Sequence, residues 1–217
     1  MKKKILSVAL VVIIALVAVA GASLAFLTDK DEATNTFTIG NVDIRILEST
    51  LHRQNDNASD DEIIADAANY SKYLDENGKD MVPGRWVKKA PYVQNIGRND
   101  AYVRVKVILP TAVFDKISIM LYTTGQNDTE KGFTMATTTE GVNTVLVFTF
   151  VKALAPNEMT YYAPIWQFKV NDACDNKDLE DLQGYDQVIT VVAEAIQAEG
   201  FANATEAFAA FEAQNNP

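Results

Sequence analysis

Along most of the chain, apolar and polar residues alternate with a period of two, which is the pattern of β-strands that bury one face. Residues 101–109 show it most clearly. Their apolar face consists of alternate residues, Ala101, Val103, Val105 and Val107. The opposite face carries Tyr102, Arg104 and Lys106. The pattern predicts a strand with its valines on a core and its polar side chains facing the other way.

Other segments rich in β-branched and aromatic residues are separated by turns that contain glycine, proline or asparagine. Strands are expected at 36–39, 42–48, 86–95, 113–122 (toward its end), 133–138, 142–151, 161–170 and 185–196. Residues 86–95 and 101–109 flank a short turn and are predicted to pair. Pro91 has no N–H to donate, so it is expected at an edge or a bulge. Residues 142–151 are apolar at both parities, which indicates a central strand. These short strands predict an all-β, antiparallel β-sandwich.

Helix is expected in two places only. Residues 48–80 are acidic and poor in apolar side chains, and they are predicted to form a surface insertion with helical turns in residues 60–70. Ser59 and Glu62 have the spacing of a capping box there. A C-terminal helix is predicted over residues 203–214, with Asn203 as N-cap and with Phe208 and Phe211 docking it on the sandwich. Residues 26–217 are therefore expected to form a single domain.

The N-terminus has the pattern of a secretory signal. Three lysines precede an apolar run over residues 5–20, and the small residues Ser23 and Ala25 follow at alternate positions. We expect residues 1–25 to be a signal peptide, cleaved between Ala25 and Phe26. The alternative is an uncleaved anchor, because residues 5–27 are long enough to span a bilayer if tilted. In both cases the remaining chain works outside the cytoplasm.

The net charge limits the classes of partner. The whole chain has a formal charge of −10, and loss of residues 1–25 removes three lysines and no acid, leaving 16 basic and 29 acidic side chains, a charge of −13. This charge repels nucleic acid and anionic lipid headgroups, so no nucleic-acid partner is expected, and the membrane is contacted only through an uncleaved signal segment. A divalent cation or a cationic partner is compatible with it.

Few residues can carry catalysis or bind a metal. Cys174 and His52 are the only residues of their types, which excludes an intramolecular disulfide and the usual zinc motifs. His52 lies in polar, loop-like sequence and is predicted to be solvated. The acidic residues of the insertion could gather a calcium ion, namely Asp56, Asp60, Asp61 and Glu62. They lack the spacing of a calcium loop, so a solvated acidic loop without a cofactor is the preferred interpretation.

Aromatic residues near position 160 allow two interpretations. Tyr161, Tyr162 and Trp166 could form a platform for a sugar. At strand spacing, however, aromatic side chains more often belong to the core. The core interpretation is preferred, and no catalytic or cofactor-binding residue is assigned.

Motifs at the start, middle and end of the chain resemble one family. The first is an alanine-ended signal followed by Asn-Thr-Phe-Thr-Ile-Gly-Asn-Val-Asp-Ile at residues 35–44. The second combines Pro83-Gly84 with Ala-Tyr-Val-Arg-Val at residues 101–105, and the third is Ala-Ile-Gln-Ala-Glu-Gly-Phe at residues 195–201, followed by Glu-Ala-Phe at residues 206–208. Together they resemble the TasA/camelysin family, which are exported proteins of Gram-positive bacteria matured by a SipW-type signal peptidase. The resemblance implies a jelly-roll-like sandwich.

The resemblance also implies a function. The chain is expected to be a secreted structural subunit of biofilm-matrix fibres or of a cell-surface coat, with copies of itself and a SipW-type signal peptidase as partners. Assembly is expected through strand addition by Thr36, Phe37, Thr38 and Ile39, which the polar residues 28–35 precede. Two alternatives stay open: a camelysin-like surface metallo-endopeptidase, for which no zinc motif is present, and a monomeric surface binding module.

Overall fold

The computed structural model describes residues 28–31, 42–78, 82–183 and 189–215. Its strands are β1 (Thr28–Asp31), β2 (Ile44–Ser49), β3 (Val87–Lys88), β4 (Ala90–Asn95), β5 (Ala101–Pro110), β6 (Ile117–Leu121), β7 (Phe133–Glu140), β8 (Asn143–Phe150), β9 (Ile165–Val170) and β10 (Thr190–Gln197). Its helices are α2 (Arg53–Asp56), α3 (Asp60–Ala67), α4 (Tyr70–Asn77), the 3₁₀ turn η1 (Thr111–Lys116), α5 (Thr123–Asn127), α6 (Asn176–Gln183) and α7 (Ala204–Asn215). The chain is mostly β, as the alternating pattern predicted.

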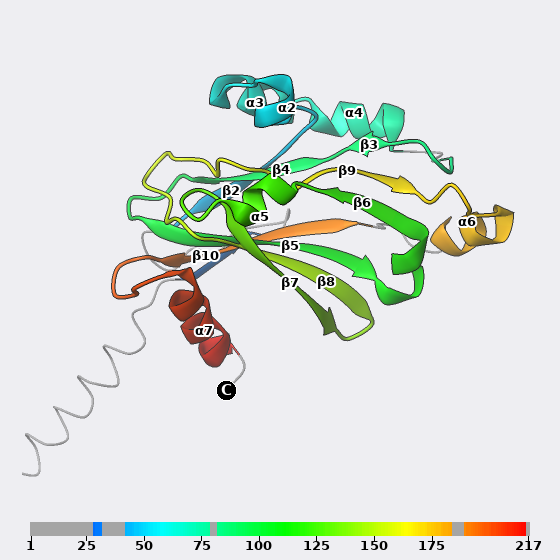
Figure 1. The fold of residues 1–217 in the computed structure, drawn as a ribbon. Coiled ribbons are helices and arrows are strands. Elements are labelled where there is room, and N and C mark those ends of the chain that lie inside the picture. Colours follow the sequence, from blue (N-terminus) through cyan, green and yellow to red (C-terminus); the bar gives the residue numbers. More distant parts are fainter. Residues whose placement is uncertain (1–27, 32–41, 79–81, 184–188, 216–217) are drawn as a thin grey trace, which may run out of the picture.

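Antiparallel sheets form two layers. One layer is a five-stranded sheet in the order β1-β10-β5-β8-β7. The other contains the pair β2-β4 and the three-stranded sheet β3-β9-β6, which lie across the larger sheet in Figure 1. Every strand pair in the described ranges is antiparallel. This arrangement agrees with the sandwich expected from the sequence.

The core lies between the layers. The alternate residues of β5 predicted to be apolar are all fully buried, namely Ala101, Val103, Val105 and Val107. β8 lies between β5 and β7 and buries Val145 on one face and Phe148 on the other, so the prediction of a central strand is confirmed. Burial of these side chains contributes roughly 1.5–3 kcal/mol for each large one.

The predicted pairing of residues 86–95 with 101–109 is wrong. The first segment breaks at Lys89 into β3, which pairs with β9, and β4, which pairs with β2, while β5 pairs with β10 and β8. The turn between β4 and β5 crosses from one layer to the other. It is held by Asp43, whose carbonyl accepts from the amides of Ile96 and Gly97 at 2.8 and 2.9 Å. Pro91 lies in β4 opposite Glu48, in a two-stranded sheet.

Helices occur in more places than expected. The insertion contains α2, α3 and α4, and the Ser59–Glu62 capping box is present. α7 begins one residue after Asn203, whose Oδ1 accepts from the amide of Glu206 at 3.0 Å. The segments around residues 123–128 and 171–184 were expected to be loops, but they contain α5 and α6. Each of these helices is short and polar, so hydrophobic periodicity gave no signal for it.

The N-terminal part of the domain also differs from expectation. Residues 28–35 were expected to be a polar lead, but Thr28–Asp31 form β1 and pair with β10 at the edge of the five-stranded sheet. The expected assembly strand, Thr36, Phe37, Thr38 and Ile39, lies outside the described residues, as do the cleavage residues Ser23, Ala25 and Phe26. In the part of the chain that is described, no helix has the length and apolar character needed to cross a bilayer.

Candidate functional site

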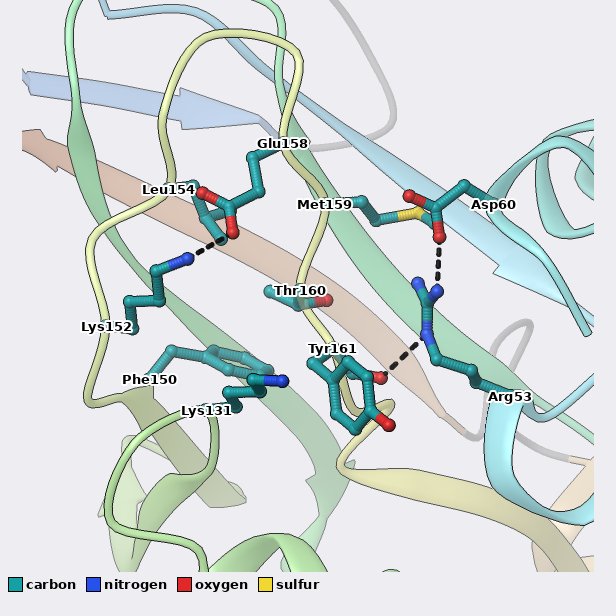
Figure 2. Close-up of a pocket in the computed structure, with 10 residues that line it drawn as sticks. All are labelled: Arg53, Asp60, Lys131, Phe150, Lys152, Leu154, Glu158, Met159, Thr160 and Tyr161. Carbon is teal, nitrogen blue, oxygen red and sulfur yellow. Dashed lines mark hydrogen bonds and ion pairs between the residues drawn. The ribbon is translucent and has the colours of Figure 1, made fainter. Parts of the chain in front are cut away.

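A pocket of about 290 Å³ opens where the insertion meets the segment between β8 and β9 (Figure 2). Its apolar and buried lining comes from Phe150, Leu154, Met159 and Thr160. Its polar lining comes from Arg53, Asp60, Lys131, Lys152, Glu158 and Tyr161. Three cations and two carboxylates therefore surround one opening on a chain of net charge −10.

Arg53 is fixed on one side of the pocket. Its guanidinium forms an ion pair with Asp60, and Nε donates to the carbonyl of Tyr161 at 3.1 Å, as Figure 2 shows. The same group lies 5.3 Å from the ring centroid of Tyr161 and 5.9 Å from that of Tyr92. Because its charge is paired and its position is restrained, Arg53 shapes the wall of the pocket more than it offers a free cation.

Lys152 is also paired. Its ammonium contacts Glu158, whose second carboxylate oxygen accepts from the amide of Ala155 at 2.9 Å. Burial alone would raise the pKa of Glu158, but these two hydrogen bonds outweigh it and the pKa is lowered. The pair is stable in its ionised form, so it contributes no net charge to the pocket.

Lys131 differs from the other two cations. Its ammonium lies 4.8 Å from the ring centroid of Tyr161, and no carboxylate in the described ranges forms an ion pair with it. Its backbone amide donates to Asp128, and this bond is the largest cause of the lowered pKa of that carboxyl. Tyr161 is 39% exposed. The pocket therefore presents one unpaired positive charge beside an accessible aromatic ring.

The aromatic residues near position 160 divide between two roles. Tyr162 is buried and its hydroxyl donates to Asp128 at 2.9 Å, so for Tyr162 the predicted core position is confirmed. Burial, followed by the nearby Asp128 carboxylate, raises the pKa of Tyr162 to about 12. Trp166 is half-buried in β9. Tyr161 instead lies at the surface, where the core interpretation does not hold.

His52 is not the solvated loop residue that the sequence predicted. It is fully buried between Tyr122 and Trp166, with ring centroids 4.3 and 5.9 Å away. Neither ring nitrogen has a well-formed hydrogen bond to a described residue. Burial lowers the pKa of His52 to about 4, against smaller opposing effects from the backbone of Ala163 and from Asp56. The imidazole is enclosed and neutral, so it cannot reach a substrate at the surface.

The acidic residues of the insertion have local partners. Asp56 accepts from the amide of His52 at 2.7 Å, Asp60 pairs with Arg53, and Glu62 completes the capping box at Ser59. Within the described ranges, no three His, Cys, Asp or Glu side chains are arranged to hold a metal ion. The structure therefore does not bring the four acids of the calcium interpretation together.

A buried charge cluster was missed by the sequence reasoning. Arg104 lies on the face of β5 opposite the valines, as predicted, but it is only 5% exposed there and pairs with Glu194, which is 1% exposed. Lys106 Nζ lies 3.3 Å from Glu194, and Arg104 Nη1 lies 2.7 Å from Glu212 on α7. Phe208 and Phe211 pack against the Arg104 guanidinium at 4.6 and 5.4 Å. This cluster attaches α7 to the outer face of the sheet.

The comparisons with known proteins add no relative. No family model, no curated protein and no solved structure matches the chain. The functional argument therefore depends on the geometry and on the motifs in the sequence.

Proposed function

We propose that this chain is an exported structural subunit that assembles into extracellular fibres or a cell-surface coat. The motifs that resemble the TasA/camelysin family support this proposal. It includes cleavage by a SipW-type peptidase between Ala25 and Phe26, with Ser23 in the cleavage motif, and a jelly-roll connectivity for the sandwich. The partners are then further copies of the same chain.

The observation that carries the proposal is the position of β1. Its four residues pair with Ala193–Ile196 of β10 at the edge of the five-stranded sheet. β10 is buried at six successive positions, Val191–Ile196, so an open edge beside it would leave backbone groups unpaired in a largely buried setting. A strand paired along this edge satisfies those backbone groups. Only two residues, Phe26 and Leu27, separate β1 from the expected cleavage point, which suits exchange of this segment between subunits.

A disulfide between register partners tests the exchange. Asp29 lies opposite Ala195, and such partners have Cα atoms about 4.5–5.5 Å apart, within the range for a disulfide. We expect the variant D29C/A195C, on a C174S background, to form covalent ladders when fibres are oxidised. A single chain that keeps its own β1 would form only an internal disulfide. Ladders would show exchange, and internal disulfides in intact fibres would contradict it.

Deletion of Phe26–Ile39 provides an independent test. Because this change removes the donated segment, the remaining chain is expected to fold but not to polymerise, as followed by electron microscopy. Circular dichroism of the deleted form controls for folding. Fibres formed by a folded, deleted chain would contradict assembly through the N-terminal segment.

The pocket favours a second candidate function, a surface module that binds an acidic polysaccharide. Lys131 offers an unpaired charge for a carboxylate, and the exposed ring of Tyr161 offers a surface for a sugar. We expect K131Q and Y161A each to weaken binding to polygalacturonate by about tenfold, the size of a lost cation–π and charge contact. K177Q, at an exposed lysine on α6, is the matched control.

The peptidase alternative gains no support from the described residues, because His52 is enclosed by aromatic rings. Zinc analysis with a casein assay on the purified protein tests it directly. Stoichiometric zinc together with chelator-sensitive cleavage would replace the structural proposal.

A further inference from the structure

One wall of the pocket is formed by a short segment, residues 52–56, which we call the α2 turn. It consists of His52 and the four residues of α2, none of which is buried. Arg53 lines the pocket, and Asn57 ends the helix in the left-handed conformation with a φ of 55°. The side chain of His52 is 0% exposed. His52 is therefore the residue that anchors the α2 turn in the molecule.

The α2 turn is attached to the segment after β8 through Tyr161. Arg53 Nε and Gln54 Nε2 both donate to the Tyr161 carbonyl, at 3.1 and 3.3 Å, and Figure 2 shows the first of these bonds. The Arg53 guanidinium also lies 5.3 Å from the centroid of the Tyr161 ring. The exposed aromatic ring of the pocket is thus held in place by the α2 turn.

The contact between the α2 turn and the sandwich contains few well-formed polar bonds. Three residues there have buried side-chain atoms without a well-formed hydrogen bond to a described residue: both ring nitrogens of His52, Oε1 of Gln54 and Nε1 of Trp166. The imidazole instead packs against the rings of Tyr122 and Trp166. Buried polar groups without partners cost stability, so this attachment depends mainly on the packing of the imidazole.

Few charges act on this imidazole. On α2, the Asp56 carboxylate favours its protonated form and the Arg53 guanidinium opposes it. The other neighbours are the phenol of Tyr122, the indole of Trp166 and the backbone of Ala163, which carry no charge between pH 4 and 7. Burial outweighs the favourable effects of Asp56 and Ala163. A proton on the ring therefore favours a state in which the imidazole reaches water.

We propose that His52 is an acid-sensitive switch for the pocket: uptake of a proton by the imidazole releases the α2 turn and removes the wall that Arg53 forms. This inference concerns the regulation of the pocket and rests on the second candidate function, in which the pocket binds an acidic polysaccharide. Release separates Arg53 from Tyr161, so a ligand meets a ring whose position is no longer fixed. Loss of this preorganisation weakens binding in acid.

The rest of the insertion has attachments of its own. Asp66 on α3 accepts from the hydroxyl of Ser49 and from the amide of Thr50, both at 2.6 Å. The hydroxyl of Tyr73 on α4 accepts from the amide of Lys88 at 2.8 Å. None of these bonds involves His52. Release is therefore expected in the α2 turn and not in α3 or α4.

Hydrogen exchange in the full chain tests the release. The Arg53 amide donates to the Tyr92 hydroxyl at 2.9 Å, so its protection reports on the attached turn. The pKa of the imidazole is about 4 when it is buried and about 6.5 when it is exposed. The protection factor of the Arg53 amide should therefore fall about 20-fold from pH 7 to pH 5. The Lys88 amide is the matched control and should keep its protection. No loss at Arg53, or an equal loss at Lys88, would overturn the proposal.

Two variants separate the imidazole from other effects of acid. H52L and H52F keep an apolar side chain against Tyr122 and Trp166 but cannot take up a proton. In both, the protection of the Arg53 amide should change less than about twofold between pH 7 and pH 5. Circular dichroism confirms folding, and the two side chains differ in size, so a defect in one variant leaves the other as the test. A 20-fold loss that persists in a folded variant would overturn the proposal.

Binding of polygalacturonate gives a second readout, which separates this inference from the candidate function. Uronate carboxylates stay ionised at pH 5, so the charge of the ligand does not change. We expect the wild type to bind about tenfold more weakly at pH 5 than at pH 7, and H52L and H52F to bind equally at both. Wild-type binding that does not depend on pH would overturn the switch and support the candidate function. No binding at either pH, together with the 20-fold change in exchange, would remove the candidate function and support the switch.

Discussion

The sandwich carries two helical covers, and they bury polar groups in opposite ways. The insertion covers β2 and β3 and contains His52, which is buried against Tyr122 and Trp166 without a well-formed bond to either ring nitrogen. α7 covers the outer face of β5 and β10 and encloses Arg104 and Glu194, each with a partner of opposite charge. One cover contains a buried imidazole without a charged partner, and the other covers side chains that form ion pairs with each other.

This difference predicts which kind of change destabilises each cover. A buried neutral imidazole is destabilised when it gains a proton, because burial penalises the charged form of His52 more than the Ala163 backbone and Asp56 favour it. A buried ion pair is costly to break, because removal of one partner leaves a charge without compensation. The insertion should therefore respond to pH, and α7 should respond to mutation.

The largest effect is expected at the α7 cluster. Arg104→Leu leaves the buried Glu194 with Lys106 alone, and removing one partner of such a pair costs about 3–5 kcal/mol. The free energy of unfolding in urea measures it. Lys152→Leu, which breaks an exposed pair with Glu158, is the control and should cost about 0–1 kcal/mol.

The double variant sharpens the result. R104L/E194L replaces both buried charges by apolar groups and should recover much of the stability that R104L loses. If the double variant is less stable than the single one, the cost comes from lost packing against Phe208 and Phe211 and not from the uncompensated carboxylate.

At the insertion, acid is expected to act through His52. The pKa of its imidazole is about 4 in the folded chain and about 6.5 in the unfolded chain, so the unfolded chain binds the proton first. Stability is therefore unaffected above pH 6.5 and falls as the pH decreases from 6.5 to 4, by about 3 kcal/mol in all. Two neighbouring charges also act on the imidazole: Asp56 raises the pKa of His52, and Arg53 lowers it.

Comparison of His52→Leu with the wild type isolates this effect. Glu62, Asp128, Glu158 and Asp178 also have lowered pKa values, so acid weakens both proteins through their carboxylates. The histidine contribution is the difference between the two pH profiles of unfolding free energy. Parallel profiles between pH 6.5 and 4 would show that His52 finds an acceptor when it is protonated.

The sequence predicted local structure better than it predicted which strands pair. The valine face of β5, the central β8 and the capping residues Ser59 and Asn203 were found because each depends on residues within one segment. The pairing of 86–95 with 101–109 failed because a period of two says which face is buried and not which strand lies alongside. That choice depends on the distant contact of Asp43 with the turn at Ile96 and Gly97.

The buried polar groups could not be found from local pattern for the same reason. His52 lies in polar sequence, and its burial comes from Tyr122 and Trp166, which are more than sixty residues away. Arg104 occupies the polar face of its strand, and that face is covered by α7 about a hundred residues later. The pocket likewise combines residues from the insertion, from the turn before β7 and from the segment after β8.

A smaller effect is expected where the insertion covers β3. Tyr70→Phe leaves the Lys88 carbonyl without its donor, and Tyr73→Phe leaves the Lys88 amide without its acceptor, each costing about 1 kcal/mol. Hydrogen exchange distinguishes them. The Lys88 amide should exchange faster in Y73F and keep its protection in Y70F. Equal exchange in both would mean that the insertion shields this edge as a whole and not through one bond.

The smallest effects are expected in the first turns of α3, in the insertion, and of α7. Ser59→Ala removes the oxygen that accepts from the Glu62 amide in α3, and Asn203→Ala removes the equivalent acceptor for Glu206 in α7. Each change should lower stability by about 1 kcal/mol, the usual cost of losing an N-cap acceptor. Ser71→Ala, on the exposed surface of α4, is the control and should have no measurable effect.

Hydrogen exchange then shows whether the covers open separately: S59A should increase exchange only in residues 60–67, and N203A only in α7. Faster exchange throughout the sandwich in either variant would show that both covers unfold with the core, as one cooperative unit.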